Sequence, residues 1–463
     1  MGTRNRAMRA MSPADVRIDT ALRRLCDWLA RTQRADIPHD IQLAAAHIMA
    51  DDLACGVCAD AHRPLAALTS RYGTSRAPGD GLARVWSAEP VWLPCRDAAG
   101  LNAIRANWNQ LDGGHTAVMC HAGLYTVGPA LAAAEAWGAD LPTLVRAVAL
   151  SYEATCRLAR AWCQADAPSH PHALWGACGA FLALATLGGL ERDAMLDGLL
   201  AAASLSPGPS FSLTASGSPL PYLWVGASVR QGFLCLDWHA SGLTRPAPGI
   251  ATVMTGLTGV QGDVNALAVP TPDGWSMRQA YHKHYACAQQ GTAALEAALL
   301  AHRGATSTQR AALPDRIVVT VHPFALTMDN PEPESEFAAR FSIPHLVAVA
   351  WCTGRDDALA LGGALLHEPT VALIRKRVQL VPAPAAGPQD RAARVSVQWR
   401  GKPPLEHECT AARGTPGRPL AAHELREKCD RLAERAFARL RHALFAFAPA
   451  NASPTPVRDL MDG

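Results

Sequence analysis

Three short clusters of polar residues contain the side-chain types that acid–base chemistry needs. The first cluster reads LNAIRANWNQLDGGHTAVMCHAG and places Asp112, His115 and His121 around two consecutive glycines. Short connections between helices commonly display His and Asp side chains, since a rigid scaffold holds them while leaving them accessible. The spacing is equally compatible with a structural role, in which Asp112 caps a helix and the histidines lie on the surface.

The second cluster, SHPHALWGACGA, places His170 and His172 at the beginning of a helix rich in small residues. The unpaired N–H groups at a helix N-terminus favour negative charge, so His170 is well placed for anion binding. Gly176 and Gly179 allow close helix packing or close approach of a ligand. The simpler alternative for His170 is a surface histidine beside a proline.

The third cluster, YHKHYACAQQGTAALEAALL, places Lys283 and Tyr285 just before another helix. A lysine and a phenol in this position could bind a carboxylate or transfer a proton. An exposed lysine without a function is the commoner case.

Metal and cofactor motifs are weak in this chain. Cys55 and Cys58 form a CxxC inside an apolar helical run without a second pair nearby, which is typical of core cysteines. His282 and His284 lie two residues apart without an evident third ligand. The sequence contains no HExxH, P-loop or GxGxxG followed by a strand. We therefore predict neither a metal nor an organic cofactor.

Composition narrows the class of protein. The chain has 463 residues, of which 49% are hydrophobic and 18% charged, so it can bury a large core in two or three domains. Its formal charge of +3 comes from scattered Lys and Arg residues, which argues against nucleic acid as a partner. Thirteen irregularly spaced cysteines and no leader sequence predict the cytoplasm. Apolar stretches such as 172–205 are interrupted by polar residues, so we expect no membrane span.

Apolar residues recur at three- and four-residue spacing through most of the first 272 residues. This pattern predicts helices, and breaks are expected at Gly138, Pro168 and Gly188. The first ~12 residues are polar and basic, and we expect a loose terminus. The predicted helices are Val16–Thr32, Ile41–Ala59, 129–137, 141–163, 172–187 and about 224–241.

The character of the sequence changes after residue 273. β-Branched runs at Arg316–Val321 and Arg394–Trp399 predict strands, beside helices at 291–302 and 344–353. An amphipathic helix is then predicted at 421–445, and it needs a partner to bury its apolar face. We expect it to return to the first domain, which gives a helical domain at 1–272, an α+β domain at 273–411 and a closing segment at 412–463.

The order of these segments resembles the MmgE/PrpD family, which includes 2-methylcitrate dehydratases, cis-aconitate decarboxylases and an iminodisuccinate epimerase. IMADDLACGVCA is similar to the family's early Leu-Asp-x-Leu-Gly helix, and His121-Ala122-Gly123 stands where the family has His-Pro-Gly. GPALAAAEAWGA, SYEATCRLA, HPHALWGACGAFLALATLGGL, KHYACAQQGTAALEA, ARFSIPHLVAVA and ELREKCDRLA then follow in the family's order.

The resemblance implies a mainly α fold, with a large helical domain built from both chain ends and an inserted, smaller α+β lid. It also implies a homodimer and a small anionic carboxylate, in particular a di- or tricarboxylate, as substrate. Departures fall at the family's catalytic positions. Gln110, Gly113 and Gly114 replace most of an acidic cluster, Pro221 replaces a lysine, and Thr292 replaces a histidine.

The residues that remain are sufficient for an acid–base site. The predicted catalytic residues are His121, Asp112, Tyr285 and His115; the predicted substrate-binding residues are His170, Lys283 and Asn102. Dehydration needs a base for a proton α to a carboxylate and an acid for the leaving hydroxide, and decarboxylation needs an acid at carbon. A cofactor-independent dehydratase or decarboxylase is therefore the predicted function.

Two other functions are compatible with the same residues. An epimerase acting α to a carboxylate needs only reversible proton transfer, and a family member without activity could still bind a carboxylate. Trp108, Trp175 and Trp224 either belong to the core or indicate a bulkier, less charged substrate.

Overall fold

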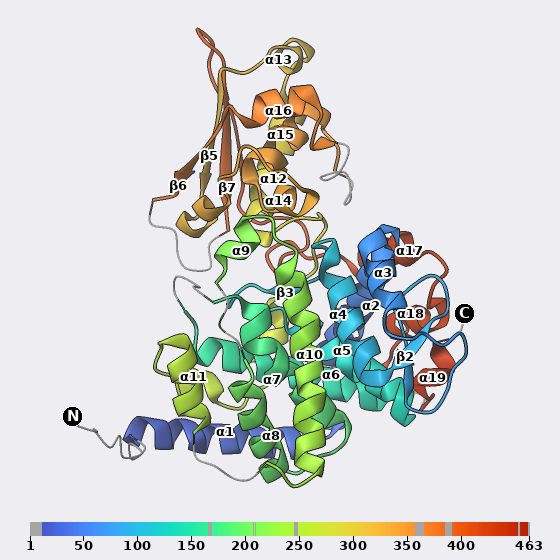
Figure 1. Cartoon of the computed structure of the whole chain (residues 1–463). Helices are drawn as coiled ribbons and strands as arrows, with labels where there is room; N and C mark the ends of the chain where they lie inside the picture. The colour runs from blue at the N-terminus through green and yellow to red at the C-terminus, as the bar shows by residue number, and fades with distance from the viewer. Residues whose placement is uncertain are drawn as a thin grey trace, which may run out of the picture.

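The computed structural model describes residues 12–164, 169–206, 208, 210–244, 249–356, 365–384, 391–451 and 454–461. It has two parts, a large helical part and a smaller α+β part that stands above it in Figure 1. The expected loose terminus and the expected break at Pro168 lie outside the described residues.

Helices from the first 258 residues make up most of the helical part. They are α1 (Pro13–Arg31), α2 (His39–Cys58), α3 (Arg63–Ser70), α4 (Cys95–Trp108), α5 (Ala122–Trp137), α6 (Leu141–Ala161), α7 (Pro171–Leu187), α8 (Arg192–Ser204), α9 (Ser212–Ala215), α10 (Leu220–Ala240) and α11 (Ile250–Thr258). Two small antiparallel sheets join them: β1 (Leu82–Arg84) with β2 (Trp92–Pro94), and β3 (Gly114–His115) with β4 (Ala280–Tyr281).

Burial patterns explain which helices lie at the surface and which lie at the centre. In α1, Ile18, Leu22, Leu25 and Leu29 are buried at three- and four-residue spacing, so one face packs on the core. Every residue of α7 is buried, and this helix packs against α5, α6 and α10. α7 is therefore the central helix of this part.

Glycines let α7 approach its neighbours closely. A Cβ atom at Gly176 would lie 2.6 Å from Ser228 Cβ on α10, and one at Gly179 would lie 2.7 Å from Tyr125 Cβ on α5. Of the two predicted uses of these glycines, the structure has close helix packing.

The α+β part is built around a four-stranded sheet with the order β6-β5-β7-β8. β5 pairs parallel with β6 and antiparallel with β7, and β7 pairs antiparallel with β8. α12 packs on β7 and β8, and α15 packs on α12, so these helices cover one face of the sheet (Figure 1). The elements are β5 (Arg316–Val321), β6 (Val378–Pro382), β7 (Ala393–Gln398), β8 (Leu405–Cys409), α12 (Gln289–Gly304), α13 (Ser307–Ala311), α14 (Glu336–Arg340), α15 (Ile343–Thr353) and α16 (Pro369–Arg375).

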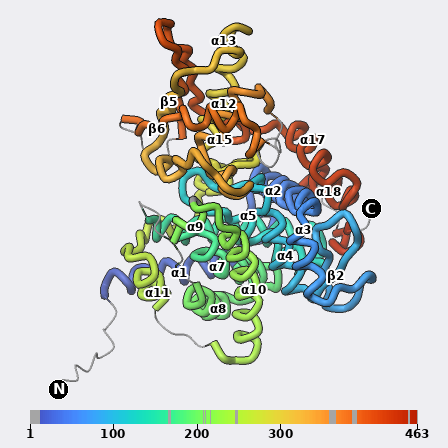
Figure 2. The backbone as a smooth tube through the Cα atoms, turned by 45° about the horizontal axis from the view of Figure 1, so that its top comes forward, coloured from blue at the N-terminus to red at the C-terminus, as the bar shows by residue number. Residues whose placement is uncertain are grey.

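The C-terminal segment returns to the helical part. α17 (Ala422–Ala433) and α18 (Ala438–Phe445) pack on α2, and α19 (Val457–Leu460) packs on α5. Figure 2 shows these red helices beside blue α2. The predicted fold class, mainly α with a smaller α+β part, is confirmed. The single helix predicted at 421–445 is wrong, because Glu434 (φ 46°) and Phe437 (φ 55°) break it.

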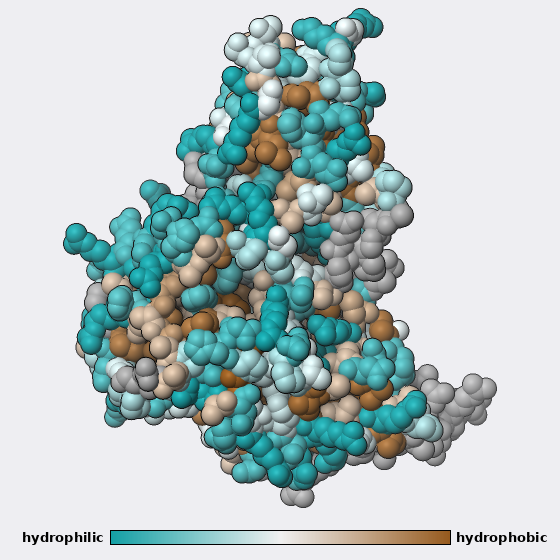
Figure 3. All heavy atoms as spheres, turned by 180° about the vertical axis from the view of Figure 1, so that it is seen from behind, coloured by the Kyte–Doolittle hydropathy of each residue, from teal (hydrophilic) through white to brown (hydrophobic). Residues whose placement is uncertain are grey.

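One apolar segment among the described residues, His39–Ala61, is long and apolar enough to cross a membrane by length and composition. Of its apolar window, 78% is buried inside the protein, as in a core helix. On the face shown in Figure 3, hydrophilic residues cover most of both parts and hydrophobic ones lie in patches between them.

A buried ion pair ties the C-terminal segment to the helical part. Lys428 Nζ on α17 lies 2.6 Å from Asp51 Oδ1 on α2 and donates to the carbonyl of Leu111 at 3.1 Å. Both charged side chains are almost fully buried. Burial alone would lower the pKa of Lys428, but the attraction of Asp51 raises it above its ordinary value.

We predict that Lys428→Met lowers the free energy of unfolding by about 3–5 kcal/mol, because Asp51 stays buried after losing its lysine. Urea denaturation measures this change. Arg431→Met, at an exposed position on the same helix, is the control and should change stability by less than about 0.5 kcal/mol. Equal stability of the two variants would contradict the importance of this pair.

Candidate active site

A cavity lies where the smaller α+β part, called the lid from here on, meets the helical part. Residues from both parts line it, and they include His121, His170 and Lys283 of the predicted site. The other lining residues are Gln110, His115, Val118, Met119, Cys120, Pro171, His172, Phe211, Tyr281, Ala288, Gln289, Gln290, Phe341 and Arg391.

Three helices direct their N-termini at this cavity. His121 is the N-cap of α5, His170 is the N-cap of α7, and Ala288 is the N-cap of α12. Each helix has at least 16 residues, and all three N-caps line the cavity. Because helix N-termini carry partial positive charge and unpaired N–H groups, their convergence favours an anionic ligand.

Asp112 and His121 form the acid–base pair of the site. His121 Nδ1 lies 2.7 Å from Asp112 Oδ2 and 3.0 Å from the carbonyl of Gly113. Both partners are acceptors, so Nδ1 carries the proton and donates it, which leaves Nε2 as the basic nitrogen. The His121 side chain keeps 20% of its surface exposed, whereas Asp112 is fully buried. Asp112 therefore orients His121 for proton transfer.

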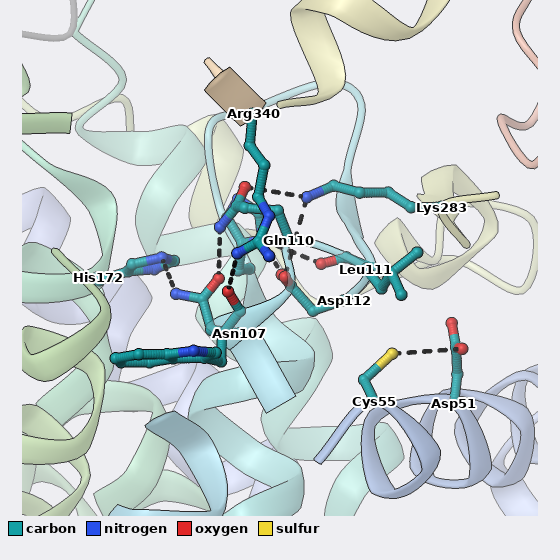
Figure 4. A network of polar contacts seen from close by, with 12 residues as sticks. Asp51, Cys55, Asn107, Gln110, Leu111, Asp112, His172, Lys283 and Arg340 are labelled. Carbon is teal, nitrogen blue, oxygen red and sulfur yellow. Dashed lines mark hydrogen bonds and ion pairs between the residues drawn. The ribbon is translucent and has the colours of Figure 1, made fainter. Parts of the chain in front are cut away.

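Lys283 provides the positive charge beside this pair. Its Nζ lies 3.8 Å from Asp112 Oδ1 and donates to Gln110 Oε1 at 3.3 Å (Figure 4). The Lys283 side chain is almost completely buried, and Asp112 Oδ1 has no hydrogen bond within the described residues. The Asp112 carboxylate thus lies between a histidine and a lysine.

A chain of hydrogen bonds, called the relay below, extends from Lys283 through Gln110 and Asn107 into the helical part (Figure 4). Gln110 Nε2 donates to Asn107 Oδ1 at 2.7 Å, and Asn107 Nδ2 donates to His172 Nε2 at 2.8 Å. His172 Nδ1 then donates to the Tyr125 hydroxyl at 3.0 Å. Burial holds the pKa of His172 well below its ordinary value, so the ring is neutral. The relay fixes the orientation of every group in it.

The turn that carries Gln110 has a strained backbone, and Arg340 of the lid binds it. Gln110 has a φ of 54°, a left-handed conformation that costs a non-glycine residue ~1–2 kcal/mol. Arg340 of α14 donates to the carbonyl of Trp108 at 2.7 Å and to Asn109 Oδ1 at 3.2 Å (Figure 4). A cation at the C-terminal end of α4 also complements the helix dipole. The lid therefore stabilises the turn that carries Gln110 and Asp112.

The two consecutive glycines make room for a tyrosine. A Cβ atom at Gly114 would lie 2.4 Å from Tyr281 Oη, and one at Gly113 would lie 2.5 Å from the Tyr281 carbonyl. The pairing of β3 with β4 brings these residues side by side. Burial, followed by the charge of Asp112, raises the pKa of Tyr281, so the phenol is protonated. Tyr281 lines the cavity where the acidic cluster is lost.

Two predicted site residues lie away from the cavity. Asn102 accepts from the backbone N–H of Trp86 at 2.8 Å and donates to the carbonyl of Arg84 at 3.0 Å, which is a structural role. Tyr285 is buried in the lid, with its ring 4.7 Å from that of His284. The substrate-binding role of Asn102 and the catalytic role of Tyr285 do not fit these positions, since neither residue lines the cavity.

His115 lines the cavity, but both of its ring nitrogens have backbone partners. Nε2 donates to the carbonyl of Ser276 at 2.9 Å, and Nδ1 accepts from the N–H of Ala117 at 3.1 Å. Burial lowers the pKa of His115 to about 4. The imidazole is neutral, and each of its nitrogens makes a hydrogen bond to the backbone, which holds the segment 115–117 in place. The predicted acid–base role of His115 does not fit this geometry.

His170 keeps its predicted position at the anion-binding end of the cavity. Its Nδ1 accepts from the N–H of His172 at 3.3 Å, and its ring stacks on Phe211 with the centroids 5.4 Å apart. Burial lowers the pKa of His170 to about 3, so the ring binds as a neutral group. None of the three tryptophans considered above lines the cavity, whose aromatic wall is Phe211 and Phe341.

Among the residues that the structure describes, no group of three or more His, Cys, Asp or Glu side chains is arranged to hold a metal ion. Cys55 lies in the core with its sulfur 3.9 Å from Asp51 Oδ1. His282 bonds to the other oxygen of the same carboxylate at 2.7 Å.

Comparison with known families agrees with this architecture. The profile of the MmgE/PrpD N-terminal domain matches residues 23–261, and that of the MmgE/PrpD C-terminal domain matches residues 285–446. The chain belongs to the MmgE/PrpD family. The predicted resemblance is therefore confirmed. No curated protein matches the chain in a sequence search. The MmgE/PrpD family includes dehydratases and other lyases, and a dehydratase-type lyase activity is consistent with this membership.

We predict that Gly114→Ala destabilises the protein by roughly 1–3 kcal/mol, because the new methyl group overlaps the Tyr281 hydroxyl. Tyr281→Ala in the same chain should relieve the overlap, which gives a double-mutant coupling above about 0.5 kcal/mol in thermal or urea unfolding. Gly256→Ala, where nothing lies within 4 Å of the added Cβ, is the control and should show no loss. Additive effects of the first two substitutions would contradict the proposed packing.

Proposed function

We propose that this protein is an acid–base lyase that removes a proton α to a carboxylate of a small organic acid. The observation that supports this proposal best is the Asp112–His121 pair, whose geometry leaves His121 Nε2 as a base at a cavity surrounded by helix N-termini. Dehydration of a hydroxy acid would use both the base, His121, and a proton donor, Tyr281, that line the cavity.

Binding of the carboxylate is assigned to Lys283, His170 and the N-termini of α7 and α12. The helix termini and the ammonium would hold the carboxylate and stabilise the negative charge that develops on it when the adjacent carbon loses its proton. Because the site is largely buried, these interactions are stronger than they would be in water.

Proton transfers then follow from the positions of two residues. His121 Nε2 takes the proton from the α carbon, and the C–H electron pair forms a carbon–carbon double bond. The C–O bond of a hydroxyl group on the neighbouring carbon, β to the carboxylate, breaks, and Tyr281 donates a proton so that the group leaves as water. Proton exchange with water then returns His121 and Tyr281 to their starting states. Tyr281 takes the second acid role that the sequence suggested for Tyr285.

Reversible proton exchange without loss of water is the second candidate function, and it would make the protein an epimerase. Two groups that could add or remove a proton, His121 and Tyr281, line the same cavity, which is the observation that favours this alternative. Decarboxylation uses the same groups, with an acid donating a proton to carbon as CO2 leaves.

We predict that His121→Asn abolishes α-proton exchange with D2O, because acid–base groups of this kind contribute about 10²–10⁴-fold to rate. Tyr281→Phe should lower formation of the unsaturated product by at least about 10²-fold while α-proton exchange persists. Proton NMR of small carboxylic and hydroxycarboxylic acids in D2O measures both reactions.

Tyr285→Phe is the matched control, because it removes a phenol from the same segment at a position outside the cavity. It should retain wild-type rates. Full activity of His121→Asn, or equal loss in both tyrosine variants, would argue against these assignments.

A further inference from the structure

We infer that the substrate of this site has a single carboxylate and an apolar substituent, rather than the two or three carboxylates of the family's citrate-type acids. This inference rests on the proposed function and narrows it to a class of substrate. It follows from the charges that line the cavity and from the composition of its wall.

Few cationic side chains line the cavity among the described residues. Lys283 and Arg391 are the lysine and arginine side chains that line the cavity among the described residues. Lys283 already faces the carboxylate of Asp112 at 3.8 Å, and Arg391 Nε donates to Gln289 Oε1 at 3.2 Å. Because Lys283 already faces a buried carboxylate, few cations remain to compensate a second and a third carboxylate of a ligand.

The other lining groups add hydrogen bonds without adding charge. His115, His170 and His172 are buried, and burial lowers the pKa of each of them below the ordinary value. Gln289 and Gln290 place neutral amides at the N-terminus of α12. These groups suit a hydroxyl or carbonyl oxygen next to the carboxylate, whereas a second and third carboxylate would lose water without an opposite charge.

An aromatic wall occupies another side of the cavity. Phe211 stacks on His170 with an angle of 13° between the rings, and Phe324 supports it from behind with a centroid distance of 5.4 Å. Phe341 from the lid and Met119 from the helical part extend this apolar surface. Packing of an alkyl or aryl group there gains favourable burial, while a carboxylate in the same place is desolvated.

Binding of unreactive acids to the full chain tests this inference independently of catalysis. Isothermal titration compares 3-phenylpropionate and 4-methylvalerate with succinate and tricarballylate. We expect the two monocarboxylates to bind at least about tenfold more tightly than the di- and tricarboxylate. Lys283→Met should weaken all four acids, because each of them needs the same carboxylate-binding group.

Phe211→Arg should reverse the preference, because it replaces part of the apolar wall with a cation. Leu300→Arg, at an exposed position near the far end of α12, is the control and should leave the preference unchanged. Tighter binding of succinate or tricarballylate to the wild type overturns the inference, and so does failure of all four acids to bind.

Proton exchange and product formation test the proposed function separately from ligand binding. Preferential binding of monocarboxylates, together with no proton exchange or product from any hydroxy acid, would support this substrate class and remove the proposed chemistry. Turnover of citrate-type acids at higher efficiency than monocarboxylic hydroxy acids would support the proposed chemistry and contradict this substrate class.

Discussion

The buried carboxylate of Asp112 is the group on which the arrangement of the site depends. A carboxylate removed from water costs several kcal/mol unless opposite charge and hydrogen bonds compensate it. Asp112 obtains this compensation from His121, 2.7 Å from one oxygen, and from Lys283, 3.8 Å from the other. The pairing of β3 with β4 connects the segments that carry these residues, although His121 and Lys283 are 162 positions apart in the sequence.

The C-terminal segment and the lid both hold the turn that carries Asp112. Leu111 lies between Gln110 and Asp112, and its carbonyl accepts a hydrogen bond from Lys428 of α17 at 3.1 Å. From the lid, Arg340 holds the end of α4 just before this turn. The strained Gln110 uses its amide to join Lys283 to Asn107. The folding of three distant segments therefore sets the geometry of a single turn.

Sequence patterns predicted the fold well where periodicity was strong. The strand at 316–321 and helices such as α1, α6 and α7 lie within a few residues of their predicted positions, because each buries a regular set of apolar residues. The break between α17 and α18 was missed, since two residues with positive φ there are neither glycine nor proline. Strands β6 and β8 were also missed, and both lie at the edges of the sheet.

Sequence reasoning brought some residues of the candidate site together and missed others. His121, His170 and Lys283 line the cavity, and Asp112 lies directly behind His121, because a short motif carries each of them to a helix N-terminus or its approach. Tyr281 was missed, since only the pairing of β3 with β4 places this tyrosine beside Gly114 and at the cavity. Gln110 was regarded as a lost acid, yet it orients Lys283. Its spacing of three residues from Asn107 was the available signal for the relay.

A crystal structure of the protein with 3-phenylpropionate tests the central claim most directly. The account predicts that the carboxylate lies against Lys283 and the N-termini of α7 and α12, with the carbon next to it within about 3.5 Å of His121 Nε2. It also predicts the phenyl ring against Phe211. A carboxylate bound elsewhere, or an α carbon directed away from His121, would contradict the assignment of Asp112 and His121 as the acid–base pair.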